Sequence, residues 1–341
     1  MTSIRPLGLE LPGEPSVPEM MAVARQAEEL GYESIWLTET RFTRDAVTTA
    51  SAIATATHRA RIATAVVNPF TRNAVLAAVT AATLDEVCAG RFVLGIGPGS
   101  PTVLARQGIR FHQPLARLRE TVDIVRGLLR GEAVSFSGET MSVTEARLDF
   151  TPVRPAIPIY LGVTGPKALA LAGEIADGVI LNGFVSLEYT KRAIEIVRSS
   201  ARASGRDPDE IEITGSVVVS VDANRLGALD VVRPLVALYL DEFPNVARES
   251  GIPSNVVNHI TAVRRREGSQ AAAALVTDTT VTDLTCSGTI AEVQEGLSRR
   301  REAGVELPIA SFAHSSMLSW LGQLVQYPDR TLANRGSPIM S

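Results

Sequence analysis

One junction recurs four times along this chain: a helical segment runs into a glycine, and an apolar, strand-forming segment begins at once. The glycines are Gly31, Gly90, Gly178 and Gly304. We expect each glycine to end its helix in the left-handed conformation, which glycine adopts without steric cost. Strands that are apolar at nearly every position are typical of parallel sheets covered on both faces by helices. The junctions therefore predict an α/β fold.

The rest of the chain supplies enough alternating segments to close a barrel. Strands are expected near residues 4–10, 33–38, 62–67, 91–96, 157–161, 178–182, 211–219 and 305–310. Regular alternation permits an open doubly wound sheet or a closed barrel, and eight units favour closure. Hydrophobic residues make up 45% of the chain and aromatic residues only 5%, which suits close packing of aliphatic side chains between helices and strands. We predict a (β/α)8 TIM barrel.

The chain is longer than a plain barrel requires. Such a barrel needs roughly 250 residues, and this sequence has 341. We place the excess in two insertions within a single barrel domain that spans residues 1–341. Residues 134–152 are expected to form a short hairpin that turns at Ser137 and Gly138, and residues 222–285 a mostly helical unit beside the barrel.

Charge, hydropathy and cysteine content exclude several classes of protein. The formal net charge is −4 and the basic residues are scattered, which argues against a nucleic-acid-binding surface. No apolar run reaches the ~18 residues of a membrane span, and the start of the chain lacks a signal-peptide pattern, so a cytoplasmic protein is expected. Cys88 and Cys286 form no CxxC pair, and the four histidines show no metal-ligand spacing. Buried, inert thiols and no metal site are expected.

The clearest physical signal for a ligand follows the fifth expected strand. In a (β/α)8 barrel the active site lies at the carboxyl ends of the strands. There a glycine-flanked turn opens a helix, with Gly162, Gly165, Pro166, Lys167 and Ala168. The free N–H groups and the positive dipole end of such a helix suit a phosphate group. The alternative is a plain turn in which Pro166 only starts the helix, and it fits these residues as well.

A second glycine-rich run, GIGPGSP at residues 95–101, follows the fourth expected strand. It lacks the full G-x-G-x-x-G fingerprint and an acidic residue after the next strand, so a Rossmann dinucleotide site is excluded. Gly97, Gly99 and Ser100 at a strand end would let a flat ring of the isoalloxazine kind approach the backbone closely. A tight turn without a ligand is the alternative.

Two carboxylates are expected at the mouth of the barrel, on neighbouring strands. Glu10 ends the first expected strand, and Glu39 follows the second. Burial beside an aromatic cofactor would raise the pKa of either group and suit it to proton transfer. The alternative for each is a salt bridge with Arg41, Arg44 or Arg72, and for Glu39 we favour the salt bridge.

Three segments, taken together, resemble the luciferase-like flavin and deazaflavin oxidoreductases, particularly those similar to methylenetetrahydromethanopterin reductase. They are TAVVNPFTRN at residues 64–73, the stretch TLDEVCAGRFVLGIGPGSP that ends at Pro101, and PIYLGVTGPKALALAGEIADGVILN at residues 158–182. The resemblance implies a (β/α)8 barrel with a cofactor lying across the strand ends. It also implies a non-proline cis peptide between Ala65 and Val66, in a bulge that supports the cofactor ring.

The resemblance further assigns roles to residues at the strand ends. The expected cofactor-binding residues are Glu39, Ala65, Val66, Asn68, Gly97, Gly99, Ser100, Gly162, Gly165, Pro166, Lys167 and Ala168. Among them, the residues from Gly162 to Ala168 match the phosphate site of the family. Glu10 in the run GLEL matches a strand-one acid of the reductases, and we expect it to be the catalytic proton donor or substrate-orienting acid. Members of the family often form dimers, so a homodimer is the expected assembly.

The expected cofactor is the deazaflavin coenzyme F420, with FMN as the alternative. The run Glu39, Thr40, Arg41 departs from the Glu-His-His run of many FMN-dependent members, and it also lacks the Asp-His pair of several deazaflavin enzymes, including sugar-phosphate dehydrogenases. We expect an oxidoreductase that transfers a hydride between reduced F420 and a small organic acceptor, with a methylene-tetrahydropterin as the favoured substrate. The alternatives are an FMN-dependent monooxygenase and a non-catalytic flavin- or deazaflavin-binding protein.

Overall fold

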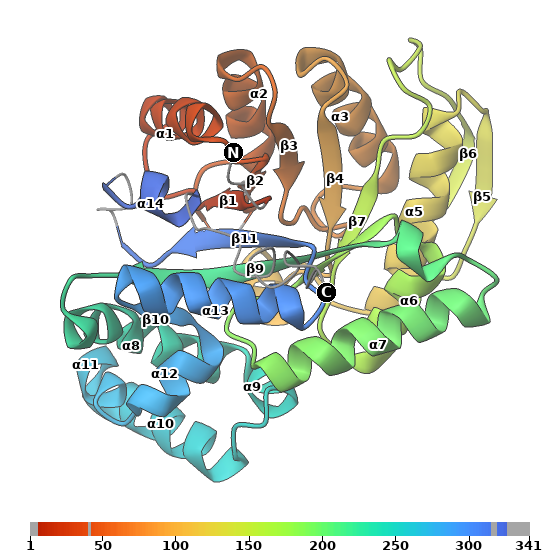
Figure 1. Cartoon of the computed structure of the whole chain (residues 1–341). Coiled ribbons are helices and arrows are strands. Elements are labelled where there is room, and N and C mark those ends of the chain that lie inside the picture. Colours follow the sequence, from red (N-terminus) through yellow and green to blue (C-terminus); the bar gives the residue numbers. More distant parts are fainter. Residues whose placement is uncertain (1–5, 40–41, 315–318, 326–341) are drawn as a thin grey trace, which may run out of the picture.

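The structure is a computed structural model that describes residues 6–39, 42–314 and 319–325. Eight parallel strands close into a barrel, since β9 pairs with β8 at one end of the strand order and with β11 at the other. In barrel order they are β1 (Gly8–Leu11), β2 (Ser34–Leu37), β3 (Arg61–Thr64), β4 (Phe92–Ile96), β7 (Ile159–Gly162), β8 (Gly178–Leu181), β9 (Glu212–Val221) and β11 (Leu307–Phe312). The predicted (β/α)8 TIM barrel is confirmed, with helices around the strands (Figure 1).

The eight barrel strands lie where the sequence predicts them, with ends that shift by a few residues. The first strand is expected from residue 4, whereas β1 begins at Gly8, and residues 1–5 lie outside the described part of the chain. A ninth strand, β10 (Cys286–Gly288), pairs with β9 outside the barrel. It is missing from the expected set because three residues carry too little hydrophobic pattern to indicate a strand.

Helices cover the outside of the barrel. They are α1 (Val17–Leu30), α2 (Ala46–Ala56), α3 (Ala74–Val87), α4 (Pro101–Arg106), α5 (Pro114–Leu129), α6 (Pro166–Ile175), α7 (Leu187–Ala203), α13 (Ile290–Glu302) and α14 (Leu321–Val325). Aliphatic side chains of the strands and helices form one large buried cluster between the two layers. A smaller cluster fills the inside of the barrel around Trp36, Tyr160 and Ile309.

The helix-to-strand glycines follow the prediction at three of the four junctions. Gly31, Gly90 and Gly304 have φ angles of 96°, 81° and 107°, in the left-handed region. The prediction is wrong at Gly178, because α6 already ends at Ile175 and Gly178 is the first residue of β8. A Cβ atom at this position would lie 2.7 Å from the ring of Tyr160. Glycine is needed there for packing inside the barrel, not for a turn.

The first insertion is the predicted hairpin. Strands β5 (Val134–Ser137) and β6 (Ser142–Ala146) pair antiparallel, and the N–H of Gly138 donates to the Met141 carbonyl across the turn. The buried carboxylate of Glu120 on α5 accepts hydrogen bonds from the backbone N–H groups of Glu139 and Thr140. The hairpin is therefore held against α5 by one buried acid.

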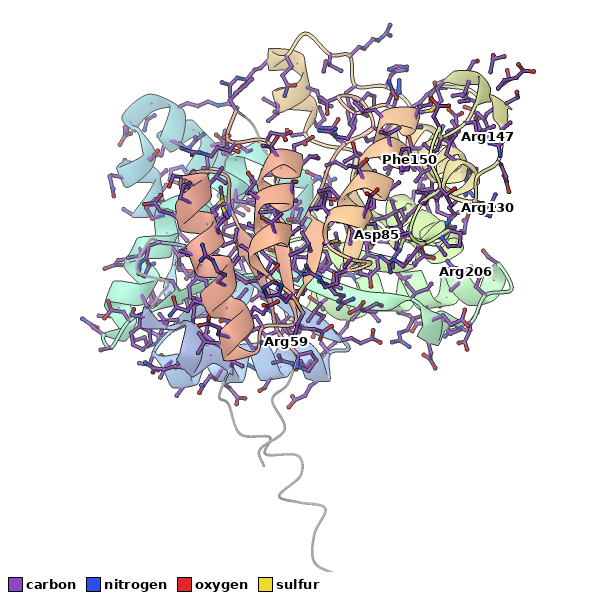
Figure 2. The ribbon with its side chains drawn as sticks, turned by 90° about the horizontal axis from the view of Figure 1, so that it is seen from above. Arg59, Asp85, Arg130, Arg147, Phe150 and Arg206 are labelled. Carbon is purple, nitrogen blue, oxygen red and sulfur yellow. The ribbon has the colours of Figure 1, made fainter. Side chains whose placement is uncertain are left out.

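A buried ion pair anchors the chain where it returns from this hairpin to β7. Asp85 on α3 is fully buried and accepts two hydrogen bonds from Arg154, at 2.9 and 2.6 Å, as well as one from the N–H of Phe92. Figure 2 shows Asp85 on α3, with Arg147 and Phe150 at the hairpin edge of the molecule. Asp85, in the TLDEVCAGRF segment, thus has a structural role.

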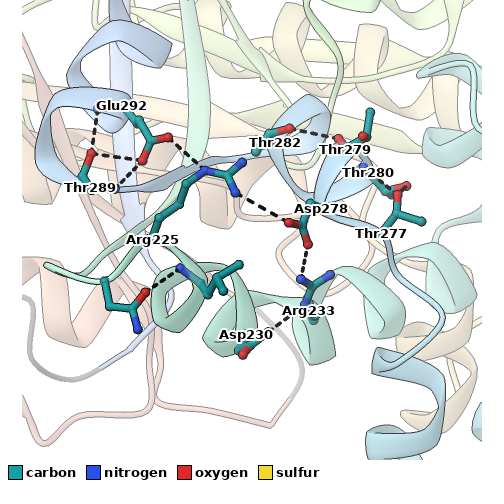
Figure 3. Close-up of polar contacts among 12 residues, drawn as sticks. Arg225, Asp230, Arg233, Thr277, Asp278, Thr279, Thr280, Thr282, Thr289 and Glu292 are labelled. Atoms are coloured by element: carbon teal, nitrogen blue, oxygen red, sulfur yellow. Dashed lines mark hydrogen bonds and ion pairs between the residues drawn. The ribbon is translucent and has the colours of Figure 1, made fainter.

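The second insertion is mostly helical, as predicted. It contains α8 (Arg225–Glu242), α9 (Pro244–Glu249), α10 (Ser254–Glu267), α11 (Ser269–Ala273) and α12 (Asp278–Leu284), which bury a hydrophobic cluster of their own. These helices gather beside β10 and α13 (Figure 1). Arg225 on α8 pairs with Glu292 on α13 at 2.9 Å and with Asp278 on α12 at 3.5 Å (Figure 3). One ion pair of Arg225 therefore connects the insertion to a helix of the barrel, and the other connects two helices of the insertion.

A charged network closes the amino-terminal end of the barrel. Arg61 donates to both oxygens of Glu212, at 2.7 and 2.9 Å, and to Glu33 at 2.5 Å. The hydroxyl of Tyr160 also donates to Glu212. Although burial opposes ionisation, the hydrogen bonds from Arg61 and Tyr160 hold the pKa of Glu212 below its usual value. This end is filled, which leaves the carboxyl ends of the strands for a ligand.

The remaining expectations concern thiols, metals and membranes. Cys88 and Cys286 are free and buried, as predicted, and burial raises the pKa of the Cys88 thiol. Within the described ranges, no group of three or more His, Cys, Asp or Glu side chains is arranged to hold a metal ion. None of the helices in those ranges has the length and apolarity that crossing a bilayer requires.

Candidate active site

The third, fourth and fifth barrel strands meet around one side chain, that of Val66. A Cβ atom on Gly97 would lie 2.4 Å from Val66 Cγ2, and a Cβ atom on Gly162 would lie 2.7 Å from Val66 Cγ1. Two expected site glycines are therefore required because Val66 occupies the space above them. The backbone at Gly97 is thus approached closely by the Val66 side chain, and the binding of a flat ring there stays a prediction.

The peptide bond between Ala65 and Val66 is cis, as the resemblance implies. The N–H of Ala65 donates to the Leu37 carbonyl on β2. Pairing with β4 resumes at Val67, whose N–H donates to the Gly95 carbonyl at 3.0 Å and whose carbonyl accepts from Gly97 at 2.9 Å. Ala65 and Val66 therefore interrupt the strand at the mouth of the barrel.

Glu10 lies in the barrel wall, with Ser311 on β11 and Trp36 on β2 as its neighbours in register. Ser216 on β9 donates a hydrogen bond of 2.7 Å to Glu10 Oε2. Burial raises the pKa of Glu10, and the hydroxyl groups of Ser216 and Ser311 only partly offset that effect. Glu10 is thus a partly buried acid with a raised pKa, at the end of the barrel where chemistry is expected.

Glu39 forms the salt bridge that we favour for it. Its Oε2 lies 3.7 Å from an Nη atom of Arg72. Burial raises the pKa of Glu39 despite this guanidinium. Arg44 donates instead to the carbonyl of Gly13, and Arg41 lies outside the described residues.

Asn68, Gly99 and Ser100 shape two adjoining turns. The side-chain oxygen of Asn68 accepts from the N–H groups of Phe70 and Thr71, at 3.1 and 3.0 Å. Gly99 has a φ of 75°, and a Cβ atom there would touch Asn68 at 3.4 Å. Ser100 caps α4. These residues have defined structural tasks at the strand ends, and a role in binding a ring stays a prediction.

Helix α6 begins at the carboxyl end of β7 without a side-chain cap. Gly165 is the N-cap residue and Pro166 is the first residue of the helix. A Cβ atom on Gly165 would meet nothing within 4 Å, so the space beside the N-cap residue is open. An uncapped helix start with open space beside it suits an anion, because its N–H groups and dipole are not neutralised.

The side chains of Lys167 and Ala168 contribute less to this opening than expected. Lys167 lines a groove between α5 and α6 together with Arg119 and Glu174, which are ion-paired with each other. Ala168 is half-buried, and its N–H donates to the Gly165 carbonyl. The structure places the lysine charge in the groove between the two helices, so the backbone is the main feature of the anion site.

Sequence reasoning missed a polar and aromatic cluster beside α6. The hydroxyl of Tyr239 on α8 donates to Asn182 Oδ1, and Asn182 Nδ2 donates to Thr164 Oγ1 at 3.4 Å. The ring of Tyr239 stacks between Phe184 and Phe243, at centroid distances of 4.4 and 4.5 Å. Asn182 follows β8 and could have been found by inspecting every strand end. Tyr239 lies in the helical insertion, where no motif identifies it.

Comparisons with known proteins agree with this architecture. A 5,10-methylenetetrahydromethanopterin reductase of Methanolobus tindarius is 29% identical over 305 residues, which are 89% of this chain and 93% of the relative. The enzyme of the same name from Archaeoglobus fulgidus is 30% identical over 308 residues, 89% of this chain and 92% of the relative. The solved structure of the coenzyme F420-dependent tetrahydromethanopterin reductase of Methanopyrus kandleri has a TM-score of 0.84 at 22% identity, over 95% of this chain and 97% of that one.

A sequence profile that covers most of the chain establishes the family. The profile described as luciferase-like monooxygenase matches residues 1–307, which include every barrel strand except β11, of which only Leu307 is matched. The cis peptide between Ala65 and Val66 and the uncapped start of α6 lie within the matched residues. This chain belongs to the luciferase-like monooxygenase family.

Proposed function

We propose that this chain is a coenzyme F420-dependent oxidoreductase that reduces a small organic acceptor. The observation that carries the proposal is the uncapped start of α6 at Gly165, which opens at the same end of the barrel as the partly buried acid Glu10. A relative from Mycobacterium tuberculosis named a putative coenzyme F420-dependent oxidoreductase, 31% identical over 324 residues, supports F420 as the cofactor. The names of the relatives from Methanolobus tindarius and Archaeoglobus fulgidus support a methylene-tetrahydropterin as the acceptor.

The residues at the start of α6 fit the phosphate group that F420 carries. The N–H of Lys167 belongs to the first turn of the helix, and no side chain caps it. A side chain on Gly165 would meet nothing within 4 Å. Backbone N–H groups at a helix start bind a phosphate through hydrogen bonds and the helix dipole. In this proposal the N–H groups of Gly165 and Lys167 hold the phosphate, because Pro166 has no N–H and that of Ala168 donates to the Gly165 carbonyl. The bulge at Ala65 and Val66 supports the ring.

Glu10 is the residue of this chain that we assign to proton transfer. When bound, reduced F420 supplies a hydride. An acceptor that gains a hydride also needs a proton, and burial raises the pKa of Glu10, which makes its carboxyl group a better proton holder than an exposed glutamate. Ser216 fixes the orientation of Glu10 through its hydrogen bond to Oε2. The chain therefore provides a positioned acid at the mouth of the barrel.

An assay of acceptor reduction tests this function. Purified protein is mixed with reduced F420 and a panel that contains a methylene-tetrahydropterin, ketones and enones, and cofactor oxidation and product are both quantified. We expect oxidation of one F420 for each acceptor reduced, with the tetrahydropterin as the best acceptor. Cofactor binding without transfer to any acceptor would instead support a non-catalytic binding protein.

The second candidate function is an FMN-dependent monooxygenase, and the family description itself favours it. Such an enzyme would consume oxygen in the presence of reduced FMN and an organic substrate. The same assay, run under air with reduced FMN in place of reduced F420 and monitored with an oxygen electrode, distinguishes the two. Oxygen consumption coupled to product formation would replace the F420 proposal.

A further inference from the structure

A second pocket lies on the outside of the barrel, and it shares no lining residue with the proposed cofactor site. It has a volume of about 390 Å³ and lies between the start of α7, the segment after α9, the end of α12 and the end of α13. The pocket is lined by charged and polar side chains, including three arginines, Arg192, Arg299 and Arg300. Nothing in the proposed reaction uses it.

Arg300 is the most unusual residue of this pocket. It is only 4% exposed, and among the described residues it forms no ion pair with a carboxylate. Both terminal nitrogens donate to one acceptor, the Val185 carbonyl, at 3.2 Å, and Nε has no partner. A buried charge without a counter-charge is costly in a protein interior. The guanidinium therefore has both charge and donors available for an anion.

Two further features of the pocket favour the same kind of ligand. Ser250 is 9% exposed, and its hydroxyl has no hydrogen-bond partner in the structure. The first turn of α7, a helix of 17 residues, also lines the pocket, at Leu187 and Glu188. The dipole of a helix start favours a negative charge. The acids that line the pocket, Glu188 and Asp283, are both exposed, and Glu188 is ion-paired with Lys191.

We propose that this pocket binds a phosphate group. The guanidinium of Arg300 and the free hydroxyl of Ser250 provide hydrogen bonds that a tetrahedral oxyanion accepts. The N-cap residue of α7, Ser186, already accepts from the N–H of Tyr189, so the start of α7 adds mainly its dipole, which favours a negative charge.

The Val185 carbonyl held by Arg300 follows Phe184, whose ring stacks on Tyr239. A phosphate bound to Arg300 would thus be linked, through the Val185 carbonyl, to the segment that joins β8 to α7.

Crystals soaked in selenate, an anomalously scattering analogue of phosphate, locate the anion directly. We expect an anomalous peak within hydrogen-bond distance of Arg300 and Ser250, separate from any peak at the start of α6. In solution, inorganic phosphate is titrated by calorimetry into wild type, Ser250→Ala and Arg300→Lys, with acetate as the carboxylate control. We expect phosphate affinity at this site to fall several-fold in Ser250→Ala and about tenfold in Arg300→Lys, through loss of charge-assisted hydrogen bonds.

Ser298→Ala is the matched control. Like Ser250, Ser298 is buried and its hydroxyl has no hydrogen-bond partner, but it lies on α13 and does not line the pocket. The phosphate affinity of this variant should equal that of wild type. If Arg300→Lys does not fold, Ser250→Ala and the soaked crystals decide. The proposal is overturned if selenate is absent from the pocket, if acetate binds as tightly as phosphate, or if Ser250→Ala binds phosphate as Ser298→Ala does.

Discussion

At the scale of single residues, burial determines the chemistry of Glu10. The residue lies on a four-residue strand whose other members are aliphatic or glycine, and its carboxyl group is paired with serine hydroxyls. Serine hydroxyls donate hydrogen bonds without supplying a positive charge. The pKa therefore stays above its usual value, unlike that of Glu212 at the other end of the barrel, which Arg61 lowers.

Replacing Glu10 with Gln tests its role as the acid. We expect turnover to fall by roughly 100-fold or more, as for other general acids, while F420 affinity changes little because the phosphate is held at α6. The control is Glu29→Gln, an exposed acid on α1. Steady-state kinetics and cofactor titration on both variants provide the comparison. Normal turnover in Glu10→Gln would remove this residue from the mechanism.

The pH dependence of turnover provides a second test of Glu10. Its pKa is raised, so the protonated form persists above the usual range and is lost as the pH rises through that raised value. Turnover should therefore be constant at lower pH and decline on the alkaline side. The decline should be absent from the residual activity of Glu10→Gln. A decline on the acidic side alone would indicate that Glu10 acts as a base.

Packing around Val66 gives a residue-scale prediction about stability. Gly97→Ala should destabilise the protein by about 1–3 kcal/mol, because its new methyl group would overlap Val66. Adding Val66→Ala should restore part of that loss. Gly165→Ala is the matched control, since it meets nothing within 4 Å, and its denaturation midpoint should stay close to that of wild type. Equal midpoints for Gly97→Ala and Gly165→Ala would contradict the packing seen here.

At the scale of elements, the strands and the longer helices could be predicted from sequence because each carries a repeated local signal. The left-handed glycines at Gly31, Gly90 and Gly304 end helices, and apolar runs follow them. Gly178 looks identical in sequence, but its glycine is required by the ring of Tyr160 on another strand. A contact between distant segments has no local signature, and β10 is too short to have one.

The residues of the candidate site fall into the same two groups, those with a local sequence signal and those without one. Glu10 and the start of α6 could be located because strand ends and glycine-flanked turns are visible in sequence. The cis peptide between Ala65 and Val66 could be expected only from the resemblance to a known family. The orientation of Lys167 and the arrival of Tyr239 from α8 depend on how helices pack, which residue order alone does not specify.

The link from Tyr239 through Asn182 to Thr164 connects the helical insertion with the turn before α6. We expect Tyr239→Phe to keep the stacked rings but to lose this link, weakening F420 binding by about three- to tenfold. Tyr32→Phe is the matched control, because its buried hydroxyl donates to Leu321 instead. Fluorescence titration measures both affinities. Equal affinities in the two variants would show that the link does not position the turn.

At the scale of the whole molecule, the two ends of the barrel carry different kinds of polar groups. The amino-terminal end is closed by Arg61, Glu212 and Glu33, and it stabilises the fold. The carboxyl end holds an acid with a raised pKa and an uncapped helix start. The amino-terminal end therefore stabilises the fold and the carboxyl end provides the ligand site, as in other barrels of this type.

The closed end predicts how stability depends on pH. Because the pKa of Glu212 is lowered in the folded state, its contribution is present above the unfolded-state value and is lost as the pH falls through the folded-state value. Glu212→Gln should cost about 2 kcal/mol near neutral pH and flatten the decline in stability on acidification. Thermal unfolding at a series of pH values measures both effects. Parallel curves for wild type and Glu212→Gln would contradict the assigned pKa.

The most direct test of the proposed cofactor site is a side-by-side titration of the purified protein with F420 and with FMN, with the heat of binding measured by calorimetry. We expect saturable binding of F420, with much weaker binding of FMN. We also expect that Gly165→Asp, which places a carboxylate before α6, abolishes F420 binding without unfolding the protein. Tight binding of FMN with no binding of F420, or full F420 affinity in Gly165→Asp, would contradict the proposed cofactor site.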